Sequence, residues 1–299
     1  MPRRTGETWR ATLAAVVALA TAATLAACGT NGTPERVAVK PPQHCSTTSC
    51  PELPVYSSKR LAPSGVDASN QATAAPAYMS EVLDDLDAVW QDWFAQLNIE
   101  RTSAGRALIP ANQPFVSKCL EDEMPEGIPS DFPNAFFCPI DTQPDGSGTE
   151  RDGTIILPEQ TFTDIWNGKL MGSSGIMLGD FTAATIIAHE YGHNVVFRLN
   201  QAYGLGDNGV PTGDNRELIA DCFAGNWAAT VFERKDLSFK EMAQAAALII
   251  SVGDAKSGQG HGTSFARATA LWRGFSENLK RQGQPGDCLK QYWPEVLQG

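Results

Sequence analysis

Residues 181–200 constrain the chain more than any other stretch, because a mostly apolar run contains His189-Glu190-x-x-His193. On a helix, residues four apart lie on one face, about 6 Å apart along the axis, so both imidazoles can reach one ion. This is the spacing of a zinc site in which the Glu is the general base. Glu190 can take a proton from a water bound by the metal, because zinc lowers the pKa of that water to about 7. The alternative is an amphipathic helix that merely carries two of the four histidines of the chain.

A third ligand is needed, because catalytic zinc takes three protein ligands and leaves one position open. The stretch 215–227 places Glu217 and Asp221 four residues apart among apolar residues, which predicts a buried helix. A buried carboxylate needs a partner or a metal. We therefore expect Glu217 to be the third ligand and Asp221 to accept the free ring N–H of a histidine ligand. Asp221 as the ligand, or two solvated carboxylates on a surface helix, are the alternatives.

Short motifs elsewhere in the chain accompany these two helices. The set comprises His189 to His193, Arg216 to Gly225, Gly260 to Ser264, Phe137 to Pro139, Thr154 to Leu157 and Gly179 to Phe181. Together they resemble the bacterial putative neutral zinc metallopeptidase family, over roughly residues 78–290.

The resemblance implies a zincin-like α+β domain, mostly helical, with a small sheet beside the HExxH helix. It also implies one Zn²⁺ per chain, hydrolysis of a peptide or protein substrate, and Glu217 as third ligand in an HExxH plus ExxxD pattern. Residues Asn194 to Val196 depart from the family, whose members often continue with another His and a Gln. We expect this change in the wall of the cleft and not at the metal.

The N-terminus reads as an export signal. Residues 1–27 combine three arginines with an Ala-rich apolar stretch, and Leu25-Ala26-Ala27-Cys28 resembles a lipobox. This predicts cleavage before Cys28, lipidation of its thiol and an anchor on the outer face of the bacterial cell membrane; ordinary secretion is the alternative. Residues 28–75 are rich in Pro, Ser, Thr, Ala and Gly, which predicts a flexible tether before a catalytic domain at 76–299.

Six cysteines remain besides Cys28, an even number that suits disulfides in an oxidising compartment. Proximity in sequence favours three pairs among the 15 possible pairings of six cysteines. The expected pairs are Cys45 with Cys50, Cys119 with Cys138 and Cys222 with Cys288. Cys222 as a zinc ligand is a weaker alternative, because it lies on a different helical face from Glu217.

Charge excludes one class of partner. Residues 1–27 contain three arginines and one glutamate, so their removal changes the formal charge from −11 to −13. An acidic chain repels nucleic acid, and the sequence contains no basic patch that could bind it. The oligomeric state does not follow from these features.

Apolar periodicity predicts a core helix over 79–97, and short apolar runs predict strands near 107–109, 135–137 and 154–157. The run 154–157 is expected either as an edge strand that receives the substrate by strand addition or as ordinary sheet core. Further on, Ser238 and Glu241 form a capping box that opens a helix through Ile250, and a last helix is expected over 264–280.

His261 lies in a glycine-rich segment, where its N–H can approach a cleft and stabilise the oxyanion of the reaction. Tyr203 is the alternative donor, whereas Tyr191 is expected in the core. His44 is expected to have no role in the site. The loop 203–214 has oxygen-bearing side chains but not the spacing of an EF-hand, so we expect a loop beside the cleft.

The sequence therefore predicts a monozinc endopeptidase, in which His189, His193 and Glu217 hold the ion and Glu190 activates water. Two alternatives remain at this point. One is an envelope lipoprotein that binds zinc without catalysis, which needs a fourth protein ligand. The other is a zinc amidase that cuts cell-wall peptides and differs only in substrate.

Overall fold

A 26-residue helix, α1 (Gln71–Gln96), carries the apolar stripe predicted for residues 79–97 and packs against α3 (Asp180–Tyr203). Its tryptophans, Trp90 and Trp93, are fully buried, as expected of core residues. The helix begins before the predicted start, although Pro76 lies inside it. Burial of Ala75 and Tyr78 explains this extension, because tertiary packing outweighs the local preference of a proline.

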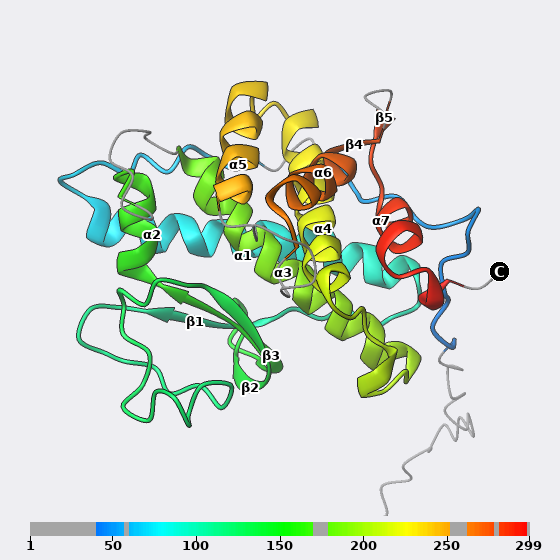
Figure 1. Ribbon diagram of the computed structural model, residues 1–299, viewed down its shortest axis with the longest axis horizontal. Helices are drawn as coiled ribbons and strands as arrows, with labels where there is room; N and C mark the ends of the chain where they lie inside the picture. Colours follow the sequence, from blue (N-terminus) through cyan, green and yellow to red (C-terminus); the bar gives the residue numbers. More distant parts are fainter. Residues whose placement is uncertain (1–39, 57–59, 170–178, 252–261, 278–280, 298–299) are drawn as a thin grey trace, which may run out of the picture. The chain divides into compact units, whose positions relative to one another are not determined.

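The computed structural model describes residues 40–56, 60–169, 179–251, 262–277 and 281–297 (Figure 1). The predicted signal peptide and Cys28 lie outside these ranges. From Lys40 onward the chain forms one unit. Within the described residues, no helix combines the length and the apolar character that crossing a membrane requires.

A three-stranded sheet lies beside α3, in the strand order β1-β3-β2 (Figure 1). The strands are β1 (Gly105–Ile109), β2 (Phe136–Pro144) and β3 (Glu150–Pro158). β3 pairs in parallel with β1 and antiparallel with β2, and its last six residues are buried. The predicted segments 107–109 and 154–157 lie in this sheet, and the segment 135–137 begins one residue before β2. Of the two alternatives for 154–157, ordinary sheet core is confirmed and the edge strand is wrong, because β3 is central. β2 is the edge strand that contacts α3.

The remaining described elements are helical or short. They are α2 (Glu159–Trp166), η2 (Asp207–Gly209), α4 (Asp214–Glu233), α5 (Phe239–Ser251), α6 (Ser264–Phe275), β4 (Ser276–Glu277), β5 (Arg281–Gln282), α7 (Pro285–Tyr292) and η3 (Pro294–Val296). The predicted α+β class, mostly helical with a small sheet beside the HExxH helix, is confirmed. Helix α6 corresponds to the last helix predicted over 264–280, but it ends at Phe275, because Ser276 and Glu277 pair with Gln282 and Arg281. It is not the last helix, because α7 follows it.

The capping box of α5 forms as predicted. Backbone N–H of Ser238 donates to Glu241 Oε2 at 2.8 Å, and backbone N–H of Glu241 donates to Ser238 Oγ at 3.3 Å. The structure also contains the three disulfides in the predicted pairing: Cys45–Cys50, Cys119–Cys138 and Cys222–Cys288.

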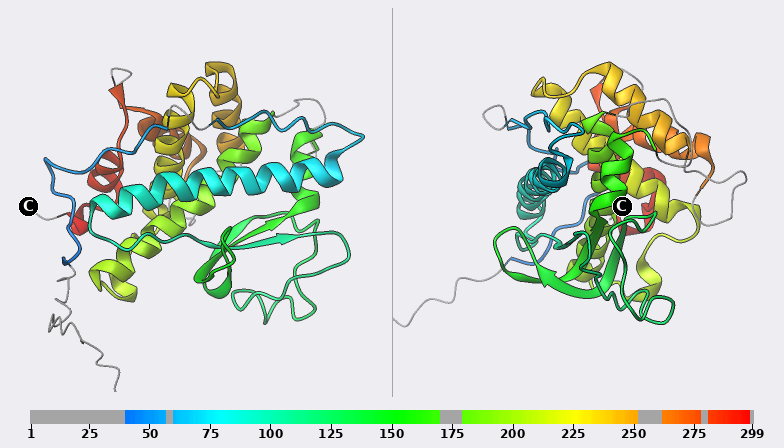
Figure 2. Two further views of the ribbon diagram at one scale, coloured as in Figure 1. Left: turned by 180° about the vertical axis from the view of Figure 1, so that it is seen from behind. Right: turned by 90° about the vertical axis from the view of Figure 1, so that its left-hand side faces the viewer.

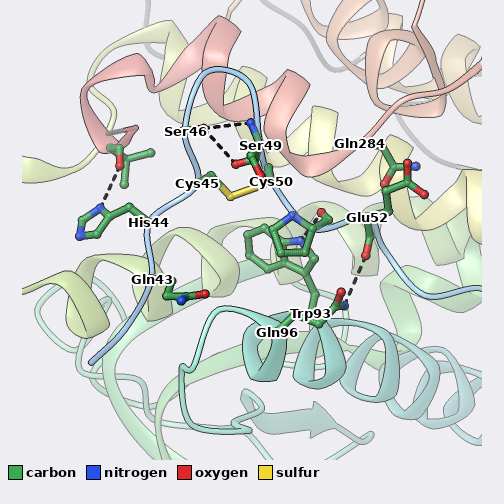
Figure 3. Close-up of a disulfide and its surroundings, with 12 residues drawn as sticks. Gln43, His44, Cys45, Ser46, Ser49, Cys50, Glu52, Trp93, Gln96 and Gln284 are labelled. Carbon is green, nitrogen blue, oxygen red and sulfur yellow. Dashed lines mark hydrogen bonds between the residues drawn. A yellow bond between two sulfur atoms is a disulfide. The ribbon is translucent and has the colours of Figure 1, made fainter. Parts of the chain in front are cut away.

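Residues 40–56 and 60–69, which we call the strap, are not a free tether in this structure. The strap runs beside α1 (Figure 2), and Cys45, Leu53 and Leu61 belong to the hydrophobic core. Figure 3 shows its first part around the Cys45–Cys50 disulfide, where Trp93 Nε1–H donates to the carbonyl oxygen of Pro51 at 2.9 Å. Further along, backbone N–H of Ser64 donates to Asp180 Oδ2 at 2.8 Å.

The composition of residues 28–75 therefore misled the tether prediction for its described part. A few buried apolar residues are enough to dock an extended segment when its backbone groups find partners on the domain. The boundary expected at residue 76 falls inside α1. Truncation at that point would divide the domain.

Leu53→Ala should lower the free energy of unfolding by about 2–4 kcal/mol, because Leu53 is 4% exposed and the truncation leaves a cavity. Val55→Ala, two residues along the same strap, is the matched control. Val55 is 37% exposed, so its truncation should change the stability by less than about 0.5 kcal/mol. Urea denaturation of the oxidised domain measures both. Equal, negligible effects of the two variants would mean that the strap is undocked in solution.

Candidate metal centre

Helix α3 presents both histidines of the HExxH motif on one face, as their spacing requires. The ring centroids of His189 and His193 lie 4.8 Å apart, with the rings nearly perpendicular at 85°. Glu190 is buried beside them. Among the described residues, these three form the one group of three or more candidate metal-ligating side chains, with donor atoms within 4.8 Å of one another.

Helix α4 brings Glu217 to the same point. Its Oε2 lies 3.3 Å from Nε2 of His189 and 3.7 Å from Nε2 of His193, while its Oε1 lies 3.7 Å from Nε of Arg216. Two ring nitrogens from one helix and one carboxylate oxygen from another therefore converge. Glu190 also approaches the pair, but Glu217 Oε2 faces both Nε2 atoms at once, which makes Glu217 the better third donor.

The approach of the two helices depends on a glycine inside the motif itself. A Cβ at Gly192 would lie 2.7 Å from Cα and 2.8 Å from the carbonyl oxygen of Ala220. Since real Cβ atoms do not come this close to backbone, any other residue would push α3 and α4 apart. Gly192 thus sets the distance between the histidines and Glu217.

Asp221 lies one turn after Glu217 and contacts Nδ1 of His189, the ring nitrogen that does not face Glu217. Its Oδ1 is 2.8 Å from Nδ1 of His189, and its side chain is fully buried. This geometry fits the predicted partner of the ring N–H and disfavours Asp221 as the ligand, because Nε2 of His189 faces Glu217. Cys222 is excluded as a ligand by its disulfide with Cys288.

Arg267 of α6 was not anticipated from the sequence. Its Nε donates to Asp221 Oδ2 at 2.7 Å and its Nη2 donates to Asp221 Oδ1 at 2.9 Å. Arg267 follows the glycine-rich segment that drew attention to His261, but nothing in the local pattern marks it. Only the packing of α6 on α4 brings it to the site.

A cavity of about 580 Å³ opens beside the convergent donors. His189, Glu190, His193 and Glu217 line it, together with mostly apolar side chains from the sheet edge, α2, α3, α5 and the loop before α4. Val196 is one of these, so the segment that departs from the family pattern does contribute to the cavity wall. The site is therefore a cluster of buried and half-buried polar side chains in the wall of a mostly apolar cavity.

Comparison with known proteins settles the family. The model of the putative neutral zinc metallopeptidase family matches residues 54–288. The chain belongs to this family.

Individual relatives of this metallopeptidase family member are uncharacterised. Protein YpfJ of Escherichia coli K12 is 30% identical over 172 residues, which cover 51% of this chain and 52% of YpfJ. Protein Rv2575 of Mycobacterium tuberculosis H37Rv is 32% identical over 132 residues, 40% of each chain. The chain thus spans about half or less of the length of these relatives. No solved structure matches it.

The donor set fits the zinc that the family name implies. Two imidazole nitrogens and one carboxylate oxygen are a donor set found in catalytic zinc sites, and the buried Asp221 behind His189 supplies the outer hydrogen bond that such ligands normally have. His261 lies outside the described residues.

Tyr203 is not the oxyanion donor. It is the last residue of α3, ten residues after His193, or about 15 Å along the helix axis. Its hydroxyl donates to the carbonyl oxygen of Gln43 at 2.9 Å, and its ring stacks on His44 at 3.7 Å. Tyr203 therefore binds the strap through Gln43 and His44. Tyr191 is buried and donates to Asp87, as expected of a core residue.

Burial and charge shift the acidities of the site in opposite directions. Burial raises the pKa of Glu190, although the two histidines oppose this. Burial also acts on Glu217, but hydrogen bonds from His189 and His193 hold its pKa well below the usual value. For His189, burial disfavours the charged ring, yet Asp221 and Glu217 outweigh it and raise the pKa to about 10.

Zinc binding at pH 7.5 should therefore release about one proton per chain from His189. The metal-free ring is protonated below a pKa of about 10, and a metal ligand must be neutral. Calorimetric titration with Zn²⁺ in two buffers of different ionisation enthalpy measures this number. Asp221→Asn removes a main cause of the raised pKa, so this variant should release fewer protons. Zinc uptake by the parent protein without proton release would contradict the expected charge of His189.

Proposed function

We propose that this domain hydrolyses peptide bonds with one zinc ion held by His189, His193 and Glu217. The observation that carries the proposal is the convergence of Glu217 Oε2 on both histidine Nε2 atoms, at 3.3 and 3.7 Å, on the wall of a cavity. A bound zinc ion would supply a Lewis acid for the scissile carbonyl and would lower the pKa of water.

The protein side chains divide the remaining work. Glu190, whose pKa is raised by burial, accepts a proton from the attacking water and later gives it to the leaving amine. Asp221 holds Nδ1 of His189, so that Nε2 is free to ligate. The apolar cavity wall excludes bulk water and strengthens these electrostatic effects.

The edge strand β2 supports an extended substrate. Asn134, Ala135, Phe136 and Phe137 line the cavity, and among the described strands only β3 pairs with β2. The backbone of the other edge can thus pair with a peptide, with its side chains alternating toward the cavity. In this proposal β2, and not the segment 154–157, pairs with the substrate.

The proposal includes an exported, lipid-anchored protein. Three disulfides support an oxidising compartment, and the signal-like residues 1–27 with Cys28 support the anchor. The net charge of −11 argues against nucleic acid as a partner. A purely structural zinc site is disfavoured, because Cys222, one of its two candidate fourth ligands, is bound in a disulfide.

Glu190→Gln and Glu217→Ala separate chemistry from metal binding. Glu190→Gln should keep one zinc per chain and lose about 10²–10⁴-fold in peptide hydrolysis, because a general base is removed. Glu217→Ala should lose both the zinc and the hydrolysis. Metal analysis and cleavage of an unbiased peptide library, with cell-wall peptides as a separate substrate set, are scored on the same samples.

Glu233→Ala is the control for Glu217→Ala, because Glu233 ends the same helix and is exposed. It should match the parent in both measurements. Full hydrolysis by Glu190→Gln would remove Glu190 as the base. Cleavage of wall peptides alone would favour the amidase, and a parent without zinc would refute the proposed site.

The apolar wall should select the substrate. We expect peptides cut by the parent to carry bulky apolar residues, such as Leu, Ile or Phe, next to the cleaved bond, because such residues gain about 1.5–3 kcal/mol on burial. Val210→Glu places a charge on the wall in the partly exposed loop before α4. This variant should cleave apolar substrates about tenfold or more slowly than the parent, because burying a charge against an apolar side chain costs free energy. It should still bind zinc. Mass spectrometry of library products tests both, and equal cleavage of polar and apolar peptides by the parent would contradict the expectation.

A further inference from the structure

Arg267 is a buried cation that the proposed reaction does not use. It lies on α6 and is 5% exposed, against the fully buried Asp221 of α4. Besides its two hydrogen bonds to Asp221, its Nη2 lies 3.3 Å from Nδ1 and 3.5 Å from Nε2 of His189. The guanidinium therefore touches the imidazole ring and clamps both oxygens of the carboxylate behind it.

The packing of α6 on α4 leaves Arg267 little freedom. A Cβ at Gly274 would lie 1.8 Å from the carbonyl oxygen of Cys222, and a Cβ at Gly225 would lie 2.0 Å from that of Leu271. Asn226 Nδ2–H donates to the carbonyl oxygen of Gly274 at 2.9 Å across the same contact. Two glycines thus fix the relative position of the helices that carry Asp221 and Arg267.

An unclamped Asp221 would be a poor support for His189. A carboxylate offers about four acceptor sites and turns easily about its side-chain bonds. Here Oδ2 is held by Nε of Arg267, while Oδ1 is shared between Nη2 and the ring of His189. The bidentate geometry is specific to arginine, whose planar group presents paired donors.

The positive charge of Arg267 has a second effect on the affinity for a metal ion, opposite in direction to its effect on the position of Asp221. In the described part of the chain, the site holds three carboxylates, of which those of Glu190 and Asp221 are buried and that of Glu217 is half-buried. Arg267 is the buried cation beside them, whereas Arg216 is largely exposed. One guanidinium and one divalent ion balance three carboxylates. Charge alone would therefore make the site bind a divalent ion more tightly without Arg267, whereas a positioning role predicts weaker binding.

We propose that Arg267 is a positioning residue of the metal centre. By clamping Asp221, it orients His189 so that Nδ1–H points to the carboxylate and Nε2 points to Glu217 and His193. The inference rests on the proposed zinc site but not on the identity of the substrate. Its effect is on the affinity of the assembled ligands for Zn²⁺.

Arg234 offers a matched control elsewhere in the core. Its Nη1 and Nη2 donate to Asp85 at 2.7 and 2.8 Å, and both side chains are buried. This ion pair resembles Arg267 with Asp221 in burial and in its two hydrogen bonds. Asp85, however, accepts from Trp227 instead of a histidine of the site.

The test measures the Zn²⁺ dissociation constant of the oxidised domain by competition with a chelator. Arg267→Met and Arg267→Lys should each weaken binding by about 10–100-fold, the usual effect of losing an outer partner of a metal ligand. Arg234→Met should leave the constant within about twofold, even if it lowers stability, since distant sites act independently. Arg267→Lys keeps the charge, so it also serves if Arg267→Met does not fold.

A double-mutant cycle shows whether Arg267 acts through Asp221. In an Asp221→Asn background, Arg267→Met should change the zinc affinity by less than about threefold, because the clamped carboxylate is already gone. Unchanged affinity in Arg267→Met, tighter binding, or the same loss with and without Asp221 would each overturn the proposal. A parent protein that binds no zinc would instead refute the proposed function on which it rests.

Discussion

The close contact of α3 with α4 at Gly192 is the constraint on which the rest of the site depends. Two helices that touch through a glycine and Ala220 can bring short side chains from both to one point. His189 and His193 need about one helical turn between them, and Glu217 lies about one turn from the contact on the other helix. A wider separation would leave the carboxylate beyond the reach of both rings.

Burying charged groups beside this contact costs free energy, and two features of the structure offset that cost. Large apolar side chains pack in the core that contains these helices, among them Trp90 and Trp93 of α1 and Trp227 of α4, which are almost completely buried. Two pairs of buried opposite charges also form, Asp221 with Arg267 and Asp85 with Arg234. A carboxylate left alone in such surroundings would destabilise the domain by several kcal/mol.

Local and periodic signals were read correctly from the sequence. The HExxH spacing, the Ser238 capping box and the apolar stripe of α1 each depend on residues within one or two helical turns. The disulfide pairs followed from proximity and from counting, because few cysteines were left once the nearest had been paired. Glu217 and Asp221 were predicted for a similar reason, since carboxylates inside an apolar helix need an explanation.

The errors have a common physical origin in contacts between distant segments. The strap has the composition of a linker, yet Leu53 and Leu61 dock it through partners more than a hundred residues away, such as Gln284 and Asp236. The order of strands in the sheet depends on pairing that no single strand encodes. Arg267 is an ordinary helical arginine until α6 packs on α4, and no pattern in its own segment reveals that neighbour.

Helix α4 has one further consequence, which concerns how such a chain can change over evolutionary time. This single helix makes five different contacts. Glu217 faces the candidate metal site, Ala220 contacts α3 and Asp221 binds Arg267. Cys222 forms the disulfide to α7, and Gly225 contacts α6. Inserting or deleting one residue inside it would turn everything beyond that point by about 100°. Several unrelated contacts would then be lost in one step. We therefore expect related chains to differ in length in the loops around α4 and not inside it.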